Sequence, residues 1–351
     1  MDAFVYNANP GRVIFGGGTL SRLPAEVERL GLTRVLVLAT PVQESYAQGI
    51  ARQIGARSAA VFADARMHTP VDVTDRAMQV VTAMRIDGLV AVGGGSTTGL
   101  AKAIALRTDL PQIVAPTTYA GSEMTPILGE TQAGRKVTQS SPRILPEVVI
   151  YDVDLTFTLP VAQSVTSGIN AIAHAVEALY TREANPLISM MAENSIAALA
   201  SGLPGIAANP SDRAARSQAL YGAWLAGICL GSVGMALHHK LCHTLGGLYD
   251  LPHAETHTAL LPHAVAYNRD AAPAAMTAVA RALHVDDPAR GLYDLAASLG
   301  AKMALRDLGM PDRGILEATE ASLSNPYWNP RPLEKGAIQS LLTAAYLGTR
   351  P

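Results

Sequence analysis

The chain has 351 residues, of which 49% are hydrophobic and 16% are charged, with a formal net charge of −2. This composition excludes a disordered chain, and the lack of any basic or acidic block argues against nucleic acid or a membrane surface as the main partner. The length favours two domains.

The sequence also bears on the compartment. No apolar run approaches the roughly 20 residues of a membrane-spanning helix, and the N-terminus has no basic or apolar region typical of an export signal. The two cysteines, Cys229 and Cys242, are not a disulfide framework. We therefore expect a cytoplasmic globular protein.

Short β-rich runs alternate with helical stretches over residues 1–158. Continuously apolar runs occur at 35–38, 89–92, 113–115 and 148–150, and stretches 45–54 and 75–83 have helix-compatible spacing. Continuous apolar runs are typical of strands covered on both faces, so we predict a Rossmann-like parallel α/β domain. Near the N-terminus, runs 4–6 and 13–15 flank Asn9-Pro10-Gly11, which predicts a small β-hairpin.

The composition changes near residues 158–160. Alanine, leucine and methionine dominate residues 167–230, and β-branched runs disappear. This composition is typical of packed helices, so we predict an all-helical second domain over 159–351.

A glycine cluster follows the apolar run 89–92. Gly93, Gly94, Gly95 and Ser96 lead into a helix-forming segment that contains Lys102. Glycines let a ligand approach the backbone, and the N–H groups at a helix start attract phosphate. The segment lacks the Gly-x-Gly-x-x-Gly and P-loop patterns, and an ordinary tight turn is the alternative. Its place in a strand–helix series favours a pyrophosphate site.

A second loop follows the run 113–115. Its small hydroxylated residues, Thr117, Thr118 and Ser122, suit a loop around a ribose or nicotinamide. An ordinary loop in which Ser122 caps the next helix is an equally good interpretation.

Seven of the nine histidines lie between residues 174 and 263. Asn170 and His174 are spaced i, i+4 on a predicted helix, and so are His239 and His243 on another, while His253 follows a break. Imidazoles grouped in this way suit either a divalent metal or acid–base chemistry on an anionic substrate. A single histidine would be structural, but the grouping indicates a functional site.

Motifs along the chain resemble those of the iron-containing (group III) alcohol dehydrogenase family. They are Gly93-Gly94-Gly95-Ser96 with Lys102, Pro116-Thr117-Thr118, Gly168-x-Asn170-x-x-x-His174-x-x-Glu177, His239-x-x-x-His243, Pro252-His253 and Leu260-Leu261-Pro262-His263. The resemblance covers most of the chain. It implies an N-terminal dinucleotide-binding domain and a C-terminal helical domain, as in dehydroquinate synthase-like folds, with the active site in the cleft between them.

The family holds its metal with one aspartate and three histidines. The matching positions are Asn170, His174, His239 and His253, so the aspartate is absent. An amide oxygen is a neutral and weaker ligand than a carboxylate. Two further departures are Gly99 in place of an aspartate and a loop after Thr118 that is one residue shorter.

With these departures, the sequence resembles one branch of the family, whose members act in bacterial degradation of aromatic compounds. The resemblance implies reduction of the carbon–carbon double bond of maleylacetate to 3-oxoadipate, with NADH or NADPH and without metal, by a homodimer. Thr40 follows a strand where an acidic residue would disfavour NADPH, so we expect NADH with NADPH accepted.

The implied mechanism places the histidines on the substrate. His174, His239 and His253 bind anionic oxygens, Asn170 avoids repelling a dianion, and His243 is the candidate proton donor. Tyr119, His238 and Lys240 are weaker candidates for carboxylate contacts. For His238 and Lys240 a solvated helix edge is the favoured alternative.

Three other functions remain open. The nearest is an iron- or zinc-dependent alcohol or aldehyde dehydrogenase in which Asn170 is a ligand. A lyase or synthase on the same scaffold would recycle its nicotinamide cofactor. A catalytically inactive binding protein is disfavoured by the retained glycines and histidines.

Overall fold

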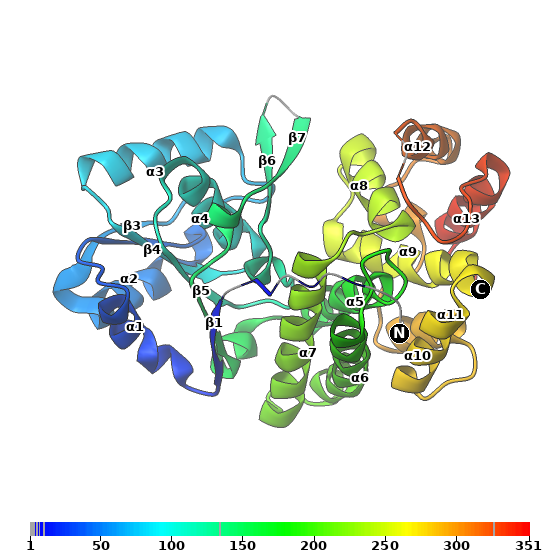
Figure 1. Cartoon of the computed structure of the whole chain (residues 1–351), viewed down its shortest axis with the longest axis horizontal. Helices are drawn as coiled ribbons and strands as arrows, with labels where there is room; N and C mark the ends of the chain where they lie inside the picture. Colours follow the sequence, from blue (N-terminus) through cyan, green and yellow to red (C-terminus); the bar gives the residue numbers. More distant parts are fainter. Residues whose placement is uncertain (1–3, 5, 7, 10, 133–134, 326) are drawn as a thin grey trace. The chain divides into compact units, whose positions relative to one another are not determined.

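The computed structural model describes residues 4, 6, 8–9, 11–132, 135–325 and 327–351 (Figure 1). The chain divides into two compact units, one formed by Ala8–Leu159 and the other built on Pro160–Pro351.

The first unit contains a six-stranded sheet in the order β1-β8-β5-β4-β2-β3, in which every pairing is parallel. Its strands are β1 (Arg12–Gly16), β2 (Val35–Leu38), β3 (Ser58–Phe62), β4 (Gly88–Gly93), β5 (Gln112–Pro116) and β8 (Val148–Asp152). The four strands predicted from apolar runs are confirmed as β2, β4, β5 and β8. The short strand β3 was not predicted.

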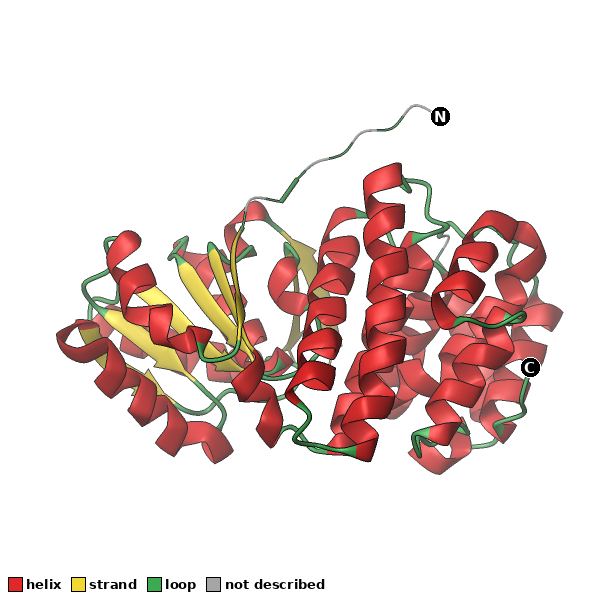
Figure 2. Cartoon of the chain, turned by 90° about the horizontal axis from the view of Figure 1, so that it is seen from below, coloured by secondary structure: helices red, strands yellow, loops and turns green. Residues whose placement is uncertain are grey.

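Helices cover both faces of this sheet (Figure 2). They are α1 (Leu23–Arg29), α2 (Glu44–Ile54), α3 (Val71–Ala83) and α4 (Gly95–Thr108). Val35 and Val37 pack in one core with α1 and α2, whereas Leu36 and Leu38 pack in the other with α3 and α4. Successive residues of β2 are therefore buried on opposite faces, which explains why the run is continuously apolar.

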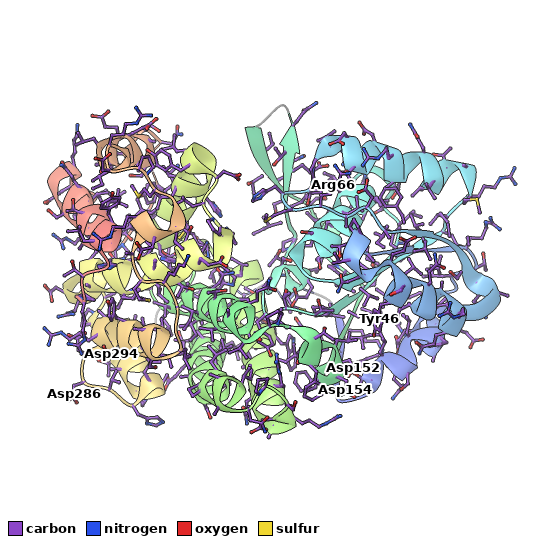
Figure 3. The ribbon with its side chains drawn as sticks, turned by 180° about the vertical axis from the view of Figure 1, so that it is seen from behind. Tyr46, Arg66, Asp152, Asp154, Asp286 and Asp294 are labelled. Carbon is purple, nitrogen blue, oxygen red and sulfur yellow. The ribbon has the colours of Figure 1, made fainter. Side chains whose placement is uncertain are left out.

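The predicted N-terminal hairpin is wrong. β1 pairs in parallel with β8, with Val13 opposite Val149, and the described part of 4–6 forms no strand; residues 5 and 10 lie outside the described residues. Asp152 at the end of β8 accepts hydrogen bonds from the N–H groups of Gly18 and Leu20, both at 2.8 Å (Figure 3). A partner more than 130 residues away is invisible to a local turn pattern.

A two-stranded antiparallel ribbon, β6 (Ile127–Gln132) and β7 (Arg135–Ser140), adds to this unit. Short 3₁₀ helices connect the elements: η1 (Thr19–Arg22), η2 (Pro41–Gln43), η3 (Gly55–Arg57), η4 (Ser122–Met124), η5 (Pro142–Ile144) and η6 (Val153–Thr158).

The second unit is helical, as predicted. It comprises α5 (Val161–Ala178), α6 (Pro186–Ala208), α7 (Arg213–Ser232), α8 (Leu237–Tyr249), α9 (His253–Asn268), η7 (Arg269–Ala271), α10 (Pro273–Leu283), α11 (Pro288–Ser298), η8 (Leu305–Leu308), α12 (Gly314–Leu323) and α13 (Lys335–Leu347). α6 and α7 pack closely at two glycines that leave no room for a side chain. A β-carbon at Gly202 would lie 2.8 Å from the backbone of Ala215, and one at Gly222 would lie 2.9 Å from that of Ser195. α9 packs against both α5 and α8, which brings three histidine-bearing helices together (Figure 1).

Among the described helices, no single one is long and apolar enough to cross a membrane. α7 and α8, bent by 92°, meet that criterion only as a pair.

Candidate active site

The glycine cluster lies where β4 ends and α4 begins. A β-carbon at Gly93 would overlap Oγ1 of Thr97, and one at Gly94 would lie 3.0 Å from Cγ2 of Thr118. Gly94 is the N-cap of α4, with no capping side chain and no acidic residue in the first turn. The first N–H groups of α4 and the positive end of its dipole therefore suit an anion such as a pyrophosphate.

Three predicted cofactor loops meet at one edge of the sheet. β2, β4 and β5 are parallel neighbours, so the loops that follow them lie side by side. The N–H of Thr117 donates to the carbonyl oxygen of Gly93 at 3.0 Å, and Thr40 Oγ1 hydrogen-bonds Gln43 Oε1 at 3.1 Å. Ser96 is half-buried at the start of α4, and Gly95 is exposed there with open space around its position. Such an edge is the usual nucleotide site of a doubly wound sheet.

Lys102, which the sequence shows only as part of the glycine-cluster motif, has a specific role in the structure. Its Nζ is buried and donates to the carbonyl oxygens of Ser122, Thr125 and Ile127, the last two at 2.7 and 2.9 Å. Burial lowers the pKa of Lys102 to about 7, while the nearby Glu123 carboxylate acts in the opposite direction. Lys102 thereby ties the loop after β5 to α4.

Ser122 and Tyr119 lie in the same loop. Ser122 Oγ is buried without a hydrogen-bond partner, and the Tyr119 side chain is fully buried. Gly99, where the family resemblance implies an aspartate, has no room for a side chain, since a β-carbon there would overlap Thr69 Oγ1.

The helical unit gathers six histidine rings, which we call the histidine cluster. They are His174 on α5, His238, His239 and His243 on α8, and His253 and His257 on α9. Neighbouring ring centroids are 4.4 to 6.3 Å apart. Five of these were predicted site residues, whereas His257 was not assigned a role.

The histidine cluster has a buried side and an exposed edge. His174, His238, His239 and His257 are buried, whereas His243 and His253 are exposed and their rings stack at 6.3 Å. Burial lowers the pKa of His238 to about 3 and holds the pKa values of His174 and His257 well below the usual range. These three rings are neutral at pH 7.

Asn170 and the histidine cluster contain five polar atoms that are buried without a hydrogen-bond partner. They are Asn170 Oδ1, His174 Nδ1, His238 Nδ1, His239 Nε2 and His257 Nε2. Buried polar atoms are nearly always paired in folded proteins. A group of unpaired ones on three packed helices indicates a site that a polar ligand completes.

Glu177, which the sequence shows only as the last residue of a family motif, organises the histidine cluster. Its buried carboxylate accepts hydrogen bonds from the N–H groups of Ala236 at 2.9 Å and His238 at 2.8 Å, and from Nδ1 of His239 at 2.7 Å. Burial alone would raise its pKa, but these hydrogen bonds lower the pKa of Glu177 to about 2. The ionised Glu177 therefore holds the start of α8 and fixes Nδ1 of His239 as the protonated nitrogen.

The solvated-edge interpretation of His238 is wrong. His238 is fully buried, because α9 covers it, and its Nε2 lies 3.0 Å from Nδ1 of His257. Lys240 is half-buried, with Nζ 5.6 Å from the ring centroid of Tyr327.

The family metal positions correspond to Asn170, His174, His239 and His253. Asn170 supplies no charge, and His174, His239 and His253 are not among the residues whose ligand atoms converge. Within the described residues, the one set of histidine, cysteine or acidic atoms that lie within 4.8 Å of each other is His238, Cys242 and His257. Among the described residues, the three histidines at the family positions therefore form no convergent ligand set, and Asn170 supplies a neutral oxygen in place of a carboxylate.

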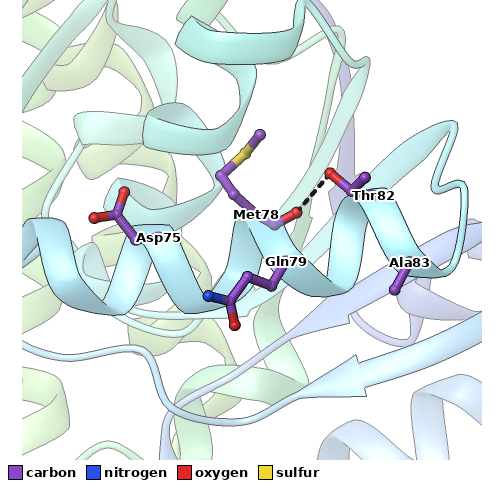
Figure 4. Close-up of a pocket in the computed structure, with 5 residues that line it drawn as sticks. All are labelled: Asp75, Met78, Gln79, Thr82 and Ala83. Atoms are coloured by element: carbon purple, nitrogen blue, oxygen red, sulfur yellow. Dashed lines mark hydrogen bonds between the residues drawn. The ribbon is translucent and has the colours of Figure 1, made fainter.

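Open depressions also occur away from these residues. One, of about 470 Å³, is formed by Asp75, Met78, Gln79, Thr82 and Ala83 along α3, where Thr82 Oγ1 donates to the Met78 carbonyl oxygen at 3.0 Å (Figure 4). It contains neither glycine-loop nor histidine-cluster residues.

These features define an oxidoreductase, and the chain belongs to the iron-containing alcohol dehydrogenase family. The family model "Iron-containing alcohol dehydrogenase" matches residues 10–153, and "Fe-containing alcohol dehydrogenase family, C-terminal" matches residues 164–346.

Within the family, the chain is similar to maleylacetate reductases. It is 55% identical to that of Rhizobium sp. (strain MTP-10005) and 52% identical to that of Burkholderia cepacia, over the full length of both chains in each case. The crystal structure of maleylacetate reductase from Agrobacterium tumefaciens is 54% identical, covers 100% of both chains and has a TM-score of 0.98.

Proposed function

We propose that this chain reduces the carbon–carbon double bond of maleylacetate to 3-oxoadipate, with NADH as the preferred donor, NADPH accepted, and no metal. The observation that carries the proposal is the group of unpaired buried polar atoms on α5, α8 and α9, in which a neutral amide replaces a carboxylate. A dianionic substrate is repelled by a carboxylate but accepts hydrogen bonds from imidazoles. The similarity to maleylacetate reductases supports the same substrate.

The cofactor supplies a hydride when bound at the loops after β2, β4 and β5. The hydride adds to the alkene carbon β to the ketone, the electron pair moves to the ketone oxygen, and an enolate forms. A proton at the α carbon then completes the reduction, so one NADH and one proton are consumed per turnover.

The histidine cluster serves the enolate and the proton. Glu177 lies 2.7 Å from Nδ1 of His239, so a positive charge on this ring beside an anionic oxygen would have a buried counter-charge. His243 lies at the exposed edge, so it exchanges protons with water and is suited to protonate the α carbon.

The test is to follow NADH absorbance with maleylacetate beside a panel of aldehydes and ketones. We expect stoichiometric NADH oxidation with maleylacetate and little with the panel. Catalytic recycling of NADH would indicate a lyase or synthase instead.

The second candidate is an iron- or zinc-dependent alcohol dehydrogenase. One observation favours it, since a carboxylate behind a histidine, as Glu177 is behind His239, also accompanies metal-ligating histidines. Loss of turnover on chelation, restored by iron or zinc, would select this function and overturn the metal-free one.

A further inference from the structure

Two rings of the histidine cluster are arranged alike. In His239 and in His257, Nδ1 is engaged by a buried partner and Nε2 is buried without one. The partner is Glu177 for His239 and His238 for His257. The two ring centroids are 4.9 Å apart at an interplanar angle of 72°.

His257 also occupies the middle of the histidine cluster. Its ring lies 4.4 Å from that of His253, 4.8 Å from that of His238 and 6.3 Å from that of His174. A ligand that completes the unpaired atoms of His174 and His239 is therefore next to His257.

The His238–His257 contact determines which nitrogen carries the proton. Two neutral imidazoles 3.0 Å apart share one proton. If His257 were the donor, the remaining N–H of His238 would lie on its Nδ1, which is buried without a partner. If His238 donates, the remaining N–H lies on His257 Nε2, where a ligand can accept it. The second arrangement avoids a permanently unpaired buried N–H. The Cys242 thiol, 3.7 Å from His238 Nε2, is too weak a partner to change this choice.

We infer that His257 is a further substrate-binding residue, which donates Nε2–H to an anionic oxygen of the substrate, and that His238 is the positioning residue that fixes this tautomer. The inference rests on the proposed function and extends it: the site presents a charge-balanced imidazole, His239, beside a neutral donor, His257. Such a pair suits a dianion: one anionic oxygen meets the ring backed by Glu177, and a second oxygen receives a hydrogen bond from a neutral ring.

The test compares two amide substitutions at the same position. His257→Gln places an amide N–H near the position of Nε2, whereas His257→Asn keeps only a group near Nδ1. We expect His257→Asn to raise KM for maleylacetate by about 10- to 100-fold, the effect of losing one hydrogen bond to a charged group. His257→Gln should recover most of that loss, and NADH affinity and Tm should stay close to those of the wild type. His238→Asn should raise KM in the same direction by a smaller factor.

The matched control is His263→Asn, because His263 is buried on the same helix with its Nε2 unpaired. It should leave KM unchanged. An unchanged KM in folded His257→Asn would overturn the inference. So would an equal rise in KM together with an equal fall in Tm in both amide variants.

A binding measurement separates this inference from the proposed function. Titration of 3-oxoadipate into the protein with NAD⁺ should show binding to the wild type and at least tenfold weaker binding to His257→Asn. Inactivity of the wild type with maleylacetate would reject the proposed function, while equal 3-oxoadipate binding by wild type and variant would reject the inference.

Discussion

The carboxylate of Glu177 lies 2.7 Å from Nδ1 of His239, and the same carboxylate holds backbone N–H groups at the start of α8. One buried side chain of α5 therefore sets both the position of α8 and the protonated nitrogen of a site histidine. Its removal leaves buried donors unpaired, so Glu177→Gln should destabilise the protein by about 3 kcal/mol.

Turnover should fall as well, because His239 loses its charge partner. Denaturant unfolding and kcat measure the two effects. The control is Glu193→Gln, which removes an exposed ion pair with Arg281 and should change stability by less than about 1 kcal/mol. Equal effects of the two substitutions would contradict the role of Glu177.

Asn170→Asp restores the carboxylate of the family metal site. We expect tighter binding of iron or zinc and a higher KM for maleylacetate, because the new charge attracts a cation and repels a dianion. Metal content after dialysis and steady-state kinetics measure the two changes. If neither changes, the charge argument for Asn170 is wrong.

His243→Ala removes the exposed imidazole assigned to proton transfer. The expected result is a kcat with maleylacetate lowered by about 10²- to 10⁴-fold, with a much smaller change in NADH affinity. Stopped-flow turnover and NADH titration provide the comparison. Unchanged turnover would remove His243 from the mechanism.

Lys102→Met removes the ammonium that joins α4 to the loop after β5. Three carbonyl oxygens then lose their donor, so the loop should loosen and KM for NADH should rise by about tenfold. Arg76→Met, which removes exposed ion pairs of α3 in the same unit, is the control and should leave this KM unchanged. A normal KM for NADH in folded Lys102→Met would show that the loop keeps its position without Lys102.

Acid should destabilise the folded chain through His263. Burial lowers its pKa from 6.5 to about 4, so between these values the unfolded chain binds a proton that the folded chain does not. The stabilisation is complete above pH 6.5 and is lost as the pH falls toward 4, by at most about 3 kcal/mol. Unfolding free energies of the wild type and His263→Leu, measured from pH 7 to 4, should show a shallower loss in the variant. Parallel curves would rule out His263 as a contributor.

Local sequence patterns determined the fold class and most of the candidate residues. Continuous apolar runs indicate burial on both faces, as in a covered parallel sheet, and they identified β2, β4, β5 and β8. Glycines before a helix predicted an anion-binding loop, and i, i+4 spacing placed Asn170 with His174, and His239 with His243, on shared helix faces.

Only the tertiary structure showed which distant residues contact one another. The pairing of β1 with β8, the contact of Glu177 with His239 and the covering of His238 by α9 all join residues far apart in the sequence. Periodicity reports how much of a side chain is buried, but not which distant element buries it. The nitrogen that carries a proton in His239 or His257 depends on such a partner, and so does the chemistry of the site.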